Sequence, residues 1–196
     1  HLKTVNGVHY DFQSAGEFVL LREGSAMEIQ ARQTPVPSAA AITNPYTGLK
    51  SCVSVNTAVV ARVGKHRVSY QPNISGEPDP TGMQLRIDGK LIDMATLQSI
   101  NLGSGARVSK SPTGNGIEIN FPNGTSLIAL PQWWGYQQKW FLNLTVFNTP
   151  ATEGILGYIH NGDWLPLLPN GTSLGARPAL LAQRYIDLNQ TFANAW

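Results

Sequence analysis

Short stretches that alternate apolar and polar residues recur along the chain and predict β-strands. The clearest is 27–32, in which Met27, Ile29 and Ala31 would share one face and the polar residues between them the other. Such alternation is typical of an antiparallel strand with one buried face. Further strands are predicted at 8–12, 17–21, 53–63, 66–70, 84–87, 90–92, 106–109, 116–121, 125–130 and 139–147.

Turn signals separate these stretches. Asn6-Gly7 predicts a type I′ hairpin, Asp88-Gly89 is a strong signal for a tight turn, and Gly64-Lys65 and 122–124 predict two more hairpins. The sequence predicts two loops, rich in proline and glycine, at 34–49 and 71–82. It predicts short helical turns at 179–185 and 190–196. Closely spaced strands of this kind favour an all-β fold, an antiparallel β-sandwich-like domain with short C-terminal helical turns.

Length and composition narrow the functional classes. The 196 residues fit one β-rich domain or two small ones, and we expect a single domain, 1–196, excised from a larger secreted protein because the chain starts at His1. With a net charge of +2 and no run of lysine and arginine, nucleic acid is not an expected partner. No apolar stretch approaches the roughly 20 residues that a membrane-spanning helix needs, so membrane insertion is not expected.

Cys52 is the single cysteine of the chain, so an intrachain disulfide is excluded. It precedes the β-branched run 53–63, which favours a half-buried strand cysteine, with an interchain disulfide as the alternative. Nothing nearby in the sequence would lower the pKa of its thiol, so a catalytic role is not favoured.

The chain contains Asn-x-Ser/Thr sequons, which favour an extracellular location and a glycoprotein. The candidate glycosylation sites are Asn73, Asn123, Asn170 and Asn189. A fifth sequon, at Asn143, lies inside an apolar predicted strand and is the weakest of the set.

Three blocks, in order along the chain, resemble the von Willebrand factor type D domain. The opening 1–21 follows the family pattern D-P-H-x-x-T-F-D-G-x-x-Y-D-F-x-x-x-G-x-Y-x-L at His1, Thr4, Gly7, Tyr10-Asp11-Phe12 and Gly16. The second block, 85–90, is similar to the family's I-D-G-K hairpin. The third, 140–146 followed by Gly154-Ile-Leu-Gly157, is similar to its last long strand and the G-L-x-G-N-x-N/D-G-D turn.

The resemblance implies a secreted or surface-displayed module for assembly or adhesion, which is not an enzyme. Its implied partners are other extracellular protein domains or copies of itself. With Cys52 alone in place of the family's cysteine framework, the chain resembles a cysteine-poor, divergent or bacterial-like member. Multimers linked by disulfides are therefore not expected.

The resemblance also implies a calcium site beside the turn that follows Gly157. On this chain the oxygen donors at the family positions are Asn6, Asn161 and Asp163, while Tyr158 stands at the position of the family's first asparagine. Calcium takes roughly six to eight oxygen ligands, and this set contains one carboxylate. The alternative is that 161–163 form a tight turn that satisfies its own backbone.

Enzymatic signatures are lacking. The sequence contains neither G-x-S-x-G nor H-E-x-x-H, and His9 and His66 stand at polar positions of predicted strands, which favours solvent-facing roles. A catalytic site assembled from distant segments would require His9, His66 or His160 to meet a nucleophile in a closed pocket.

Two further functions are compatible with the sequence. Trp133, Trp134 and Tyr136 would form a carbohydrate-binding platform if Trp134 and Tyr136 were exposed on one face. Alternatively, one tryptophan packs in the core and the other covers a strand edge, since neighbouring residues of a strand point to opposite faces. The low charge and β-rich pattern also suit a protomer of an extracellular fibre, with the loop 34–49 as the reaching element.

Overall fold

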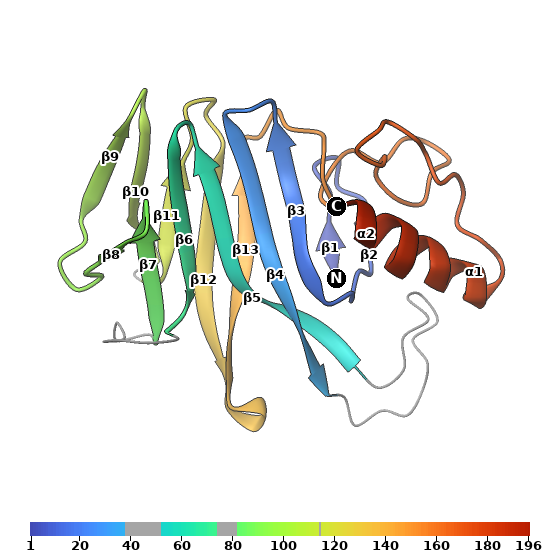
Figure 1. Cartoon of the computed structure of the whole chain (residues 1–196), viewed down its shortest axis with the longest axis horizontal. Helices are drawn as coiled ribbons and strands as arrows, with labels where there is room; N and C mark the ends of the chain where they lie inside the picture. The colour runs from blue at the N-terminus through green and yellow to red at the C-terminus, as the bar shows by residue number, and fades with distance from the viewer. Residues whose placement is uncertain (38–51, 74–81, 114) are drawn as a thin grey trace. The chain divides into compact units, whose positions relative to one another are not determined.

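A computed structural model describes residues 1–37, 52–73, 82–113 and 115–196, and its elements form three antiparallel sheets and a C-terminal helical segment (Figure 1). The predicted all-β, sandwich-like class is therefore confirmed. The small sheet pairs β1 (Leu2–Lys3) with β2 (His9–Tyr10). The six-stranded sheet has the order β3 (Gly16–Glu23), β4 (Met27–Pro37), β5 (Cys52–Val63), β6 (His66–Pro72), β7 (Met83–Ile87), β8 (Lys90–Ile92). The five-stranded sheet has the order β13 (Lys139–Phe147), β12 (Ser126–Trp134), β11 (Ile117–Asn120), β10 (Ala106–Lys110), β9 (Ser99–Gly103).

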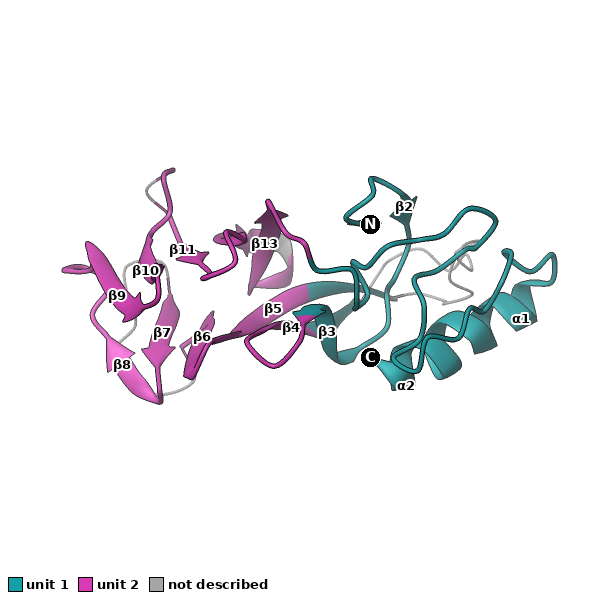
Figure 2. Ribbon diagram, turned by 90° about the horizontal axis from the view of Figure 1, so that it is seen from above, with its two compact units in different colours: residues 1–22, 33–55, 151–196 teal, residues 23–32, 56–150 magenta. Residues whose placement is uncertain are grey.

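The chain divides into two compact units (Figure 2). Unit 1 comprises 1–22, 33–55 and 151–196, and unit 2 comprises 23–32 and 56–150. The two long strands β4 and β5 contribute residues to both units.

The core of unit 1 is an aromatic cluster. Phe12 packs edge-on against Phe18, with ring centroids 4.8 Å apart, and against Phe192 at 5.9 Å. Tyr10 joins the cluster through Phe192 at 6.4 Å. All four rings are buried, so Tyr10 and Phe12 anchor the core of this unit. Phe192 comes from a continuous helical segment built from α1 (Leu181–Tyr185), the π-helix η2 (Ile186–Phe192) and α2 (Ala193–Ala195).

Unit 2 buries the inward faces of alternating strands from two sheets, which appear as two layers in Figure 2. On β11, Ile117 and Ile119 are buried while the residues between and after them are half-buried. On β6, Val68 and Tyr70 are buried in the same alternating way. The short 3-10 helix η1 (Gly135–Gln137) connects β12 to β13.

Several sequence-based boundaries are wrong. The predicted strand 8–12 pairs only at 9–10, β4 continues to Pro37 through the start of a predicted loop, and β12 continues to Trp134. Strand β9 (Ser99–Gly103) was not predicted. It pairs with β10, and the two strands are connected by the turn Gly103-Ser104-Gly105, in which all three residues have positive φ.

The N-terminal hairpin is confirmed, but its turn is not type I′. A type I′ turn needs positive φ at both central residues, whereas here only Gly7 has positive φ, at 82°. The amide of Gly7 bonds to the Thr4 carbonyl and the amide of Thr4 to the Val8 carbonyl, both at 2.9 Å. This is the three-residue hairpin loop that ends on a left-handed glycine.

Candidate functional site

The N-terminal hairpin loop is fastened to a segment more than 150 residues further along the chain. The Asn6 side chain donates from Nδ2 to the Ile159 carbonyl at 2.8 Å, and its Oδ1 accepts from the Ile159 amide at 3.2 Å. Oδ1 also accepts from the Thr4 hydroxyl at 2.9 Å. The Val5 amide adds a backbone bond to the Leu156 carbonyl at 2.9 Å. The Asn6 amide group thus pairs with a backbone as another β-strand would.

The segment 154–157 packs tightly against the outer edge of β3. The amides of Ile155 and Leu156 donate to the carbonyls of Val19 and Leu20, each at 2.9 Å. Gly154 has φ of 120°, and a Cβ there would lie 2.3 Å from the Leu20 carbonyl oxygen. Only glycine fits this close approach, because a side chain would meet backbone that cannot move aside.

The Tyr10 hydroxyl connects the same segment to the core, since it donates to the Ile155 carbonyl. Burial raises the pKa of Tyr10 well above its usual value, so the ring remains neutral at physiological pH. Tyr10 belongs to the first block of the resemblance and Ile155 to the third. The structure therefore brings the motif residues of those two blocks into direct contact.

The residues expected to hold calcium are already engaged or exposed. Asn6 uses its Oδ1 and Nδ2 on Ile159, and the Asp163 carboxylate accepts from the Ser173 hydroxyl at 2.7 Å. Asn161 is exposed in a turn closed by the Asp163 amide on the His160 carbonyl at 3.0 Å. Calcium needs roughly six to eight oxygens with several carboxylates, so these side chains as they stand do not fit the ion. These contacts favour the alternative, a tight turn at 161–163 that satisfies its own backbone, over the calcium site that the resemblance implies.

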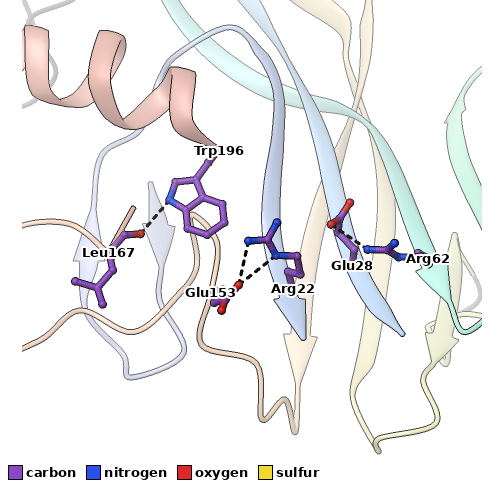
Figure 3. Close-up of polar contacts among 6 residues, drawn as sticks. All are labelled: Arg22, Glu28, Arg62, Glu153, Leu167 and Trp196. Atoms are coloured by element: carbon purple, nitrogen blue, oxygen red, sulfur yellow. Dashed lines mark hydrogen bonds and ion pairs between the residues drawn. The ribbon is translucent and has the colours of Figure 1, made fainter. Parts of the chain in front are cut away.

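Near this segment a pocket of about 190 Å³ opens within unit 1. It is lined by Thr152, Glu153, Tyr158, His160, Leu167, Leu168, Pro169, Gly171 and Trp196. The Glu153 carboxylate accepts two bonds from the Arg22 guanidinium, at 3.0 and 3.1 Å (Figure 3). The Trp196 indole donates to the Leu167 carbonyl at 3.1 Å and lies under the same guanidinium. These contacts anchor the end of the helical segment on β3.

The histidines occupy different surroundings. His66 is half-buried and pairs with Asp88 at 2.7 Å, which corrects the expectation that it faces solvent. The backbone N–H of Arg67 and then the His66 ring lower the pKa of Asp88. His160 packs against Tyr158 with ring centroids 5.0 Å apart, and His9 is exposed. The absence of enzymatic activity remains a prediction.

The three residues of the predicted aromatic platform differ in exposure. Trp133 is 49 % exposed, Trp134 is half-buried, and the side chain of Tyr136 lies outside the described residues. Trp133 lies opposite Trp140 on β13, with ring centroids 5.2 Å apart and planes tilted by 56°. Trp140 was missed because its position on the predicted strand 139–147 gave no sign of which partner it would face.

The sequons differ in accessibility. Asn170 is exposed in the turn 168–172, and its Oδ1, the atom that carries no glycan, accepts from the Thr172 amide. Asn123 is exposed, but its Nδ2 donates to Glu23. Asn73 and Asn189 are half-buried, and Nδ2 of Asn189 donates to the Tyr185 carbonyl at 3.3 Å. Asn170 is therefore the most accessible of the four candidates. The side chain of Cys52 lies outside the described residues.

Within the described residues, no helix is both long and apolar enough to cross a membrane. No protein-family model matches the sequence, and no curated protein matches it either.

Proposed function

We propose that this chain is a non-enzymatic extracellular module of the von Willebrand factor type D kind, which serves assembly or adhesion within a larger secreted protein. The observation that carries the proposal is the pairing of Asn6 with Ile159. It joins the same two turns that the family resemblance associates, the early turn and the turn after the Gly-x-x-Gly segment.

A further support is the way in which segments near both ends of the chain share one core. Tyr10 and Phe192 meet with ring centroids 6.4 Å apart, and the Val19 amide of β3 bonds to the Trp196 carbonyl at 2.9 Å. Local unfolding usually begins at poorly anchored terminal segments. A module that holds other domains together benefits when segments distant in sequence are fixed to one core.

Clustering of coated beads tests this proposal. Beads that carry the wild-type chain at high density should cluster with one another, or adhere to a surface coated with the chain, because multivalency amplifies weak contacts. Beads with the Asn6→Ala variant should cluster less, because this variant removes the side chain that joins the two turns. Beads with the Asn161→Ala variant are the control and should match wild type, because Asn161 is exposed. Wild-type beads that neither cluster nor adhere would contradict a role in contact between copies.

Carbohydrate binding is the second candidate, and the exposure of Trp133 favours it. An exposed indole offers a large apolar face with a polar edge, which suits the apolar side of a sugar ring. Trp140 supports the ring at 5.2 Å, and Gly82 packs so closely on Trp140 that a Cβ would lie 2.5 Å from its Nε1.

Titration of neutral soluble polysaccharides distinguishes this candidate. Trp133→Ala should abolish binding. Phe147→Ala is the control and should retain binding, because Phe147 lies at the other end of β13. Its side chain is 46 % exposed, so the control also removes exposed aromatic surface. Equal loss in both variants, or no binding by wild type, would contradict a sugar site at Trp133.

A further inference from the structure

The solvent-facing side of the β5–β6 hairpin in unit 2 carries a cluster of cationic side chains. Arg62 on β5 lies directly opposite Arg67 on β6, and Lys65 stands in the turn that joins the two strands. All three side chains are exposed. Like charges placed directly opposite each other destabilise an antiparallel pair, so the hairpin carries a repulsion that an anion bound between the two arginines would relieve.

The negative charge of the nearby carboxylates does not neutralise the positive charge of this cluster. Glu28 pairs with Arg62 at 3.2 Å (Figure 3). Asp88 is occupied by the His66 ring and by the backbone N–H of Arg67. In the part of the chain that the structure describes, Lys65 and Arg67 have no carboxylate in an ion pair with their side chains. The cluster therefore keeps an excess of positive charge.

The same side chains line an open pocket of about 240 Å³, together with Glu28, Gln30, Val60 and His66. A cavity of about 150 Å³ holds a benzene ring, so this volume suits one ring with a charged substituent. Val60 supplies apolar surface, and the side-chain carbonyl of Gln30 is an acceptor for a hydroxyl group, while the Glu28 carboxylate accepts from the Gln30 amide and from Arg62. The lining residues, all of them described, include no Phe, Tyr or Trp, and the ring of His66 is held by Asp88.

We infer that this pocket binds an acidic polysaccharide, with a sulfate or carboxylate group of one sugar unit held between Arg62 and Arg67. The planar guanidinium presents a fork of donors that matches such groups in a bidentate manner. A hydroxyl group of the same sugar would donate to the side-chain carbonyl of Gln30. This site is independent of the proposed assembly role, since none of its residues belongs to the hairpin loop or to the segment 154–163.

The test uses dextran sulfate and unmodified dextran of matched length, which differ only in the anionic groups, with binding measured by calorimetry. Wild type should bind dextran sulfate alone, and more weakly as salt is added, because salt screens exposed charges. Arg67→Gln should weaken binding about tenfold, the loss expected for one charged hydrogen-bonding contact. Lys65→Gln, in the turn, is the second variant and should weaken it less.

Arg107→Gln is the matched control, because it removes the same charge from an exposed residue of β10 in unit 2. It should retain binding within about twofold, a loss typical of screened long-range charge. Equal weakening by Arg107→Gln and Arg67→Gln would overturn the inference, as would equal binding of dextran. Binding of a single-stranded oligonucleotide as tightly as dextran sulfate, with the same dependence on Arg67, would also overturn it.

Discussion

Removal of the Asn6 side chain should loosen the N-terminal loop from the segment around Ile159. Asn6→Ala deletes one bond to the Ile159 carbonyl and one from its amide, at 2.8 and 3.2 Å. Ile159 is 5 % exposed, so its backbone groups would be poorly compensated by water. At about 1 kcal/mol for each bond, the free energy of unfolding should fall by about 2 kcal/mol.

Urea unfolding at neutral pH measures this loss. With an m-value of roughly 2 kcal/mol/M, a loss of about 2 kcal/mol lowers the urea midpoint by about 1 M. Amide hydrogen exchange gives a local readout, because protection in 154–163 should fall more than protection in β11 or β12. Asn161→Ala should change the free energy of unfolding by less than about 0.5 kcal/mol, as exposed substitutions usually do. A shift for Asn6→Ala as small as that control would refute the reasoning.

The remaining predictions concern three other contacts of the fold. Gly154→Ala should lower the free energy of unfolding by roughly 3 kcal/mol, because the added Cβ clashes with backbone and strains it. Gly171 has φ of 81° and open space around it, so Gly171→Ala should lower the free energy of unfolding by only about 1 kcal/mol. Urea unfolding measures both. Because the pKa of buried Tyr10 is raised, its neutral form adds stability that is fully present below about pH 10 and is lost at higher pH; Tyr10→Phe should flatten this alkaline loss in thermal melts. Because the pKa of Asp88 is lowered, its charge adds stability that is present above about pH 4 and is lost as pH falls through the folded-state pKa. Asp88→Asn keeps the turn, so its thermal midpoint should lie below that of wild type at neutral pH and approach it in acid.

The strands were largely predictable because their alternation is local. Prediction failed at β9, whose sequence 99–103 mixes exposed and half-buried residues without a buried face. It also failed for the end of β12, because the predicted strand stopped at 130 whereas β12 continues to Trp134. Strand β12 continues to Trp134 because it pairs with β13 along its whole length, up to Trp134 opposite Lys139.

The candidate sites were less predictable, because they depend on pairing between strands or on distant contacts. Arg62 and Arg67 stand five positions apart, and only the two-residue turn between β5 and β6 places them opposite each other. In the same way, Trp133 gained its partner Trp140 through the β12–β13 register. No local sequence pattern predicts the contact of Asn6 with Ile159, because the two residues are far apart in the sequence. The family resemblance did point to the two turns that this contact joins.

The central claim is that these two turns are joined directly, side chain to backbone, and that this joined unit is the basis of an assembly or adhesion module. Thermal unfolding of the wild-type chain with added calcium and with excess chelator tests it most directly. An ion that binds only the folded state raises the midpoint. Since Oδ1 of Asn6 accepts from the Ile159 amide and Oδ1 of Asp163 accepts from Ser173, we predict the same midpoint in both conditions. A clear rise with calcium would contradict this account, because it would show that the folded chain binds the ion.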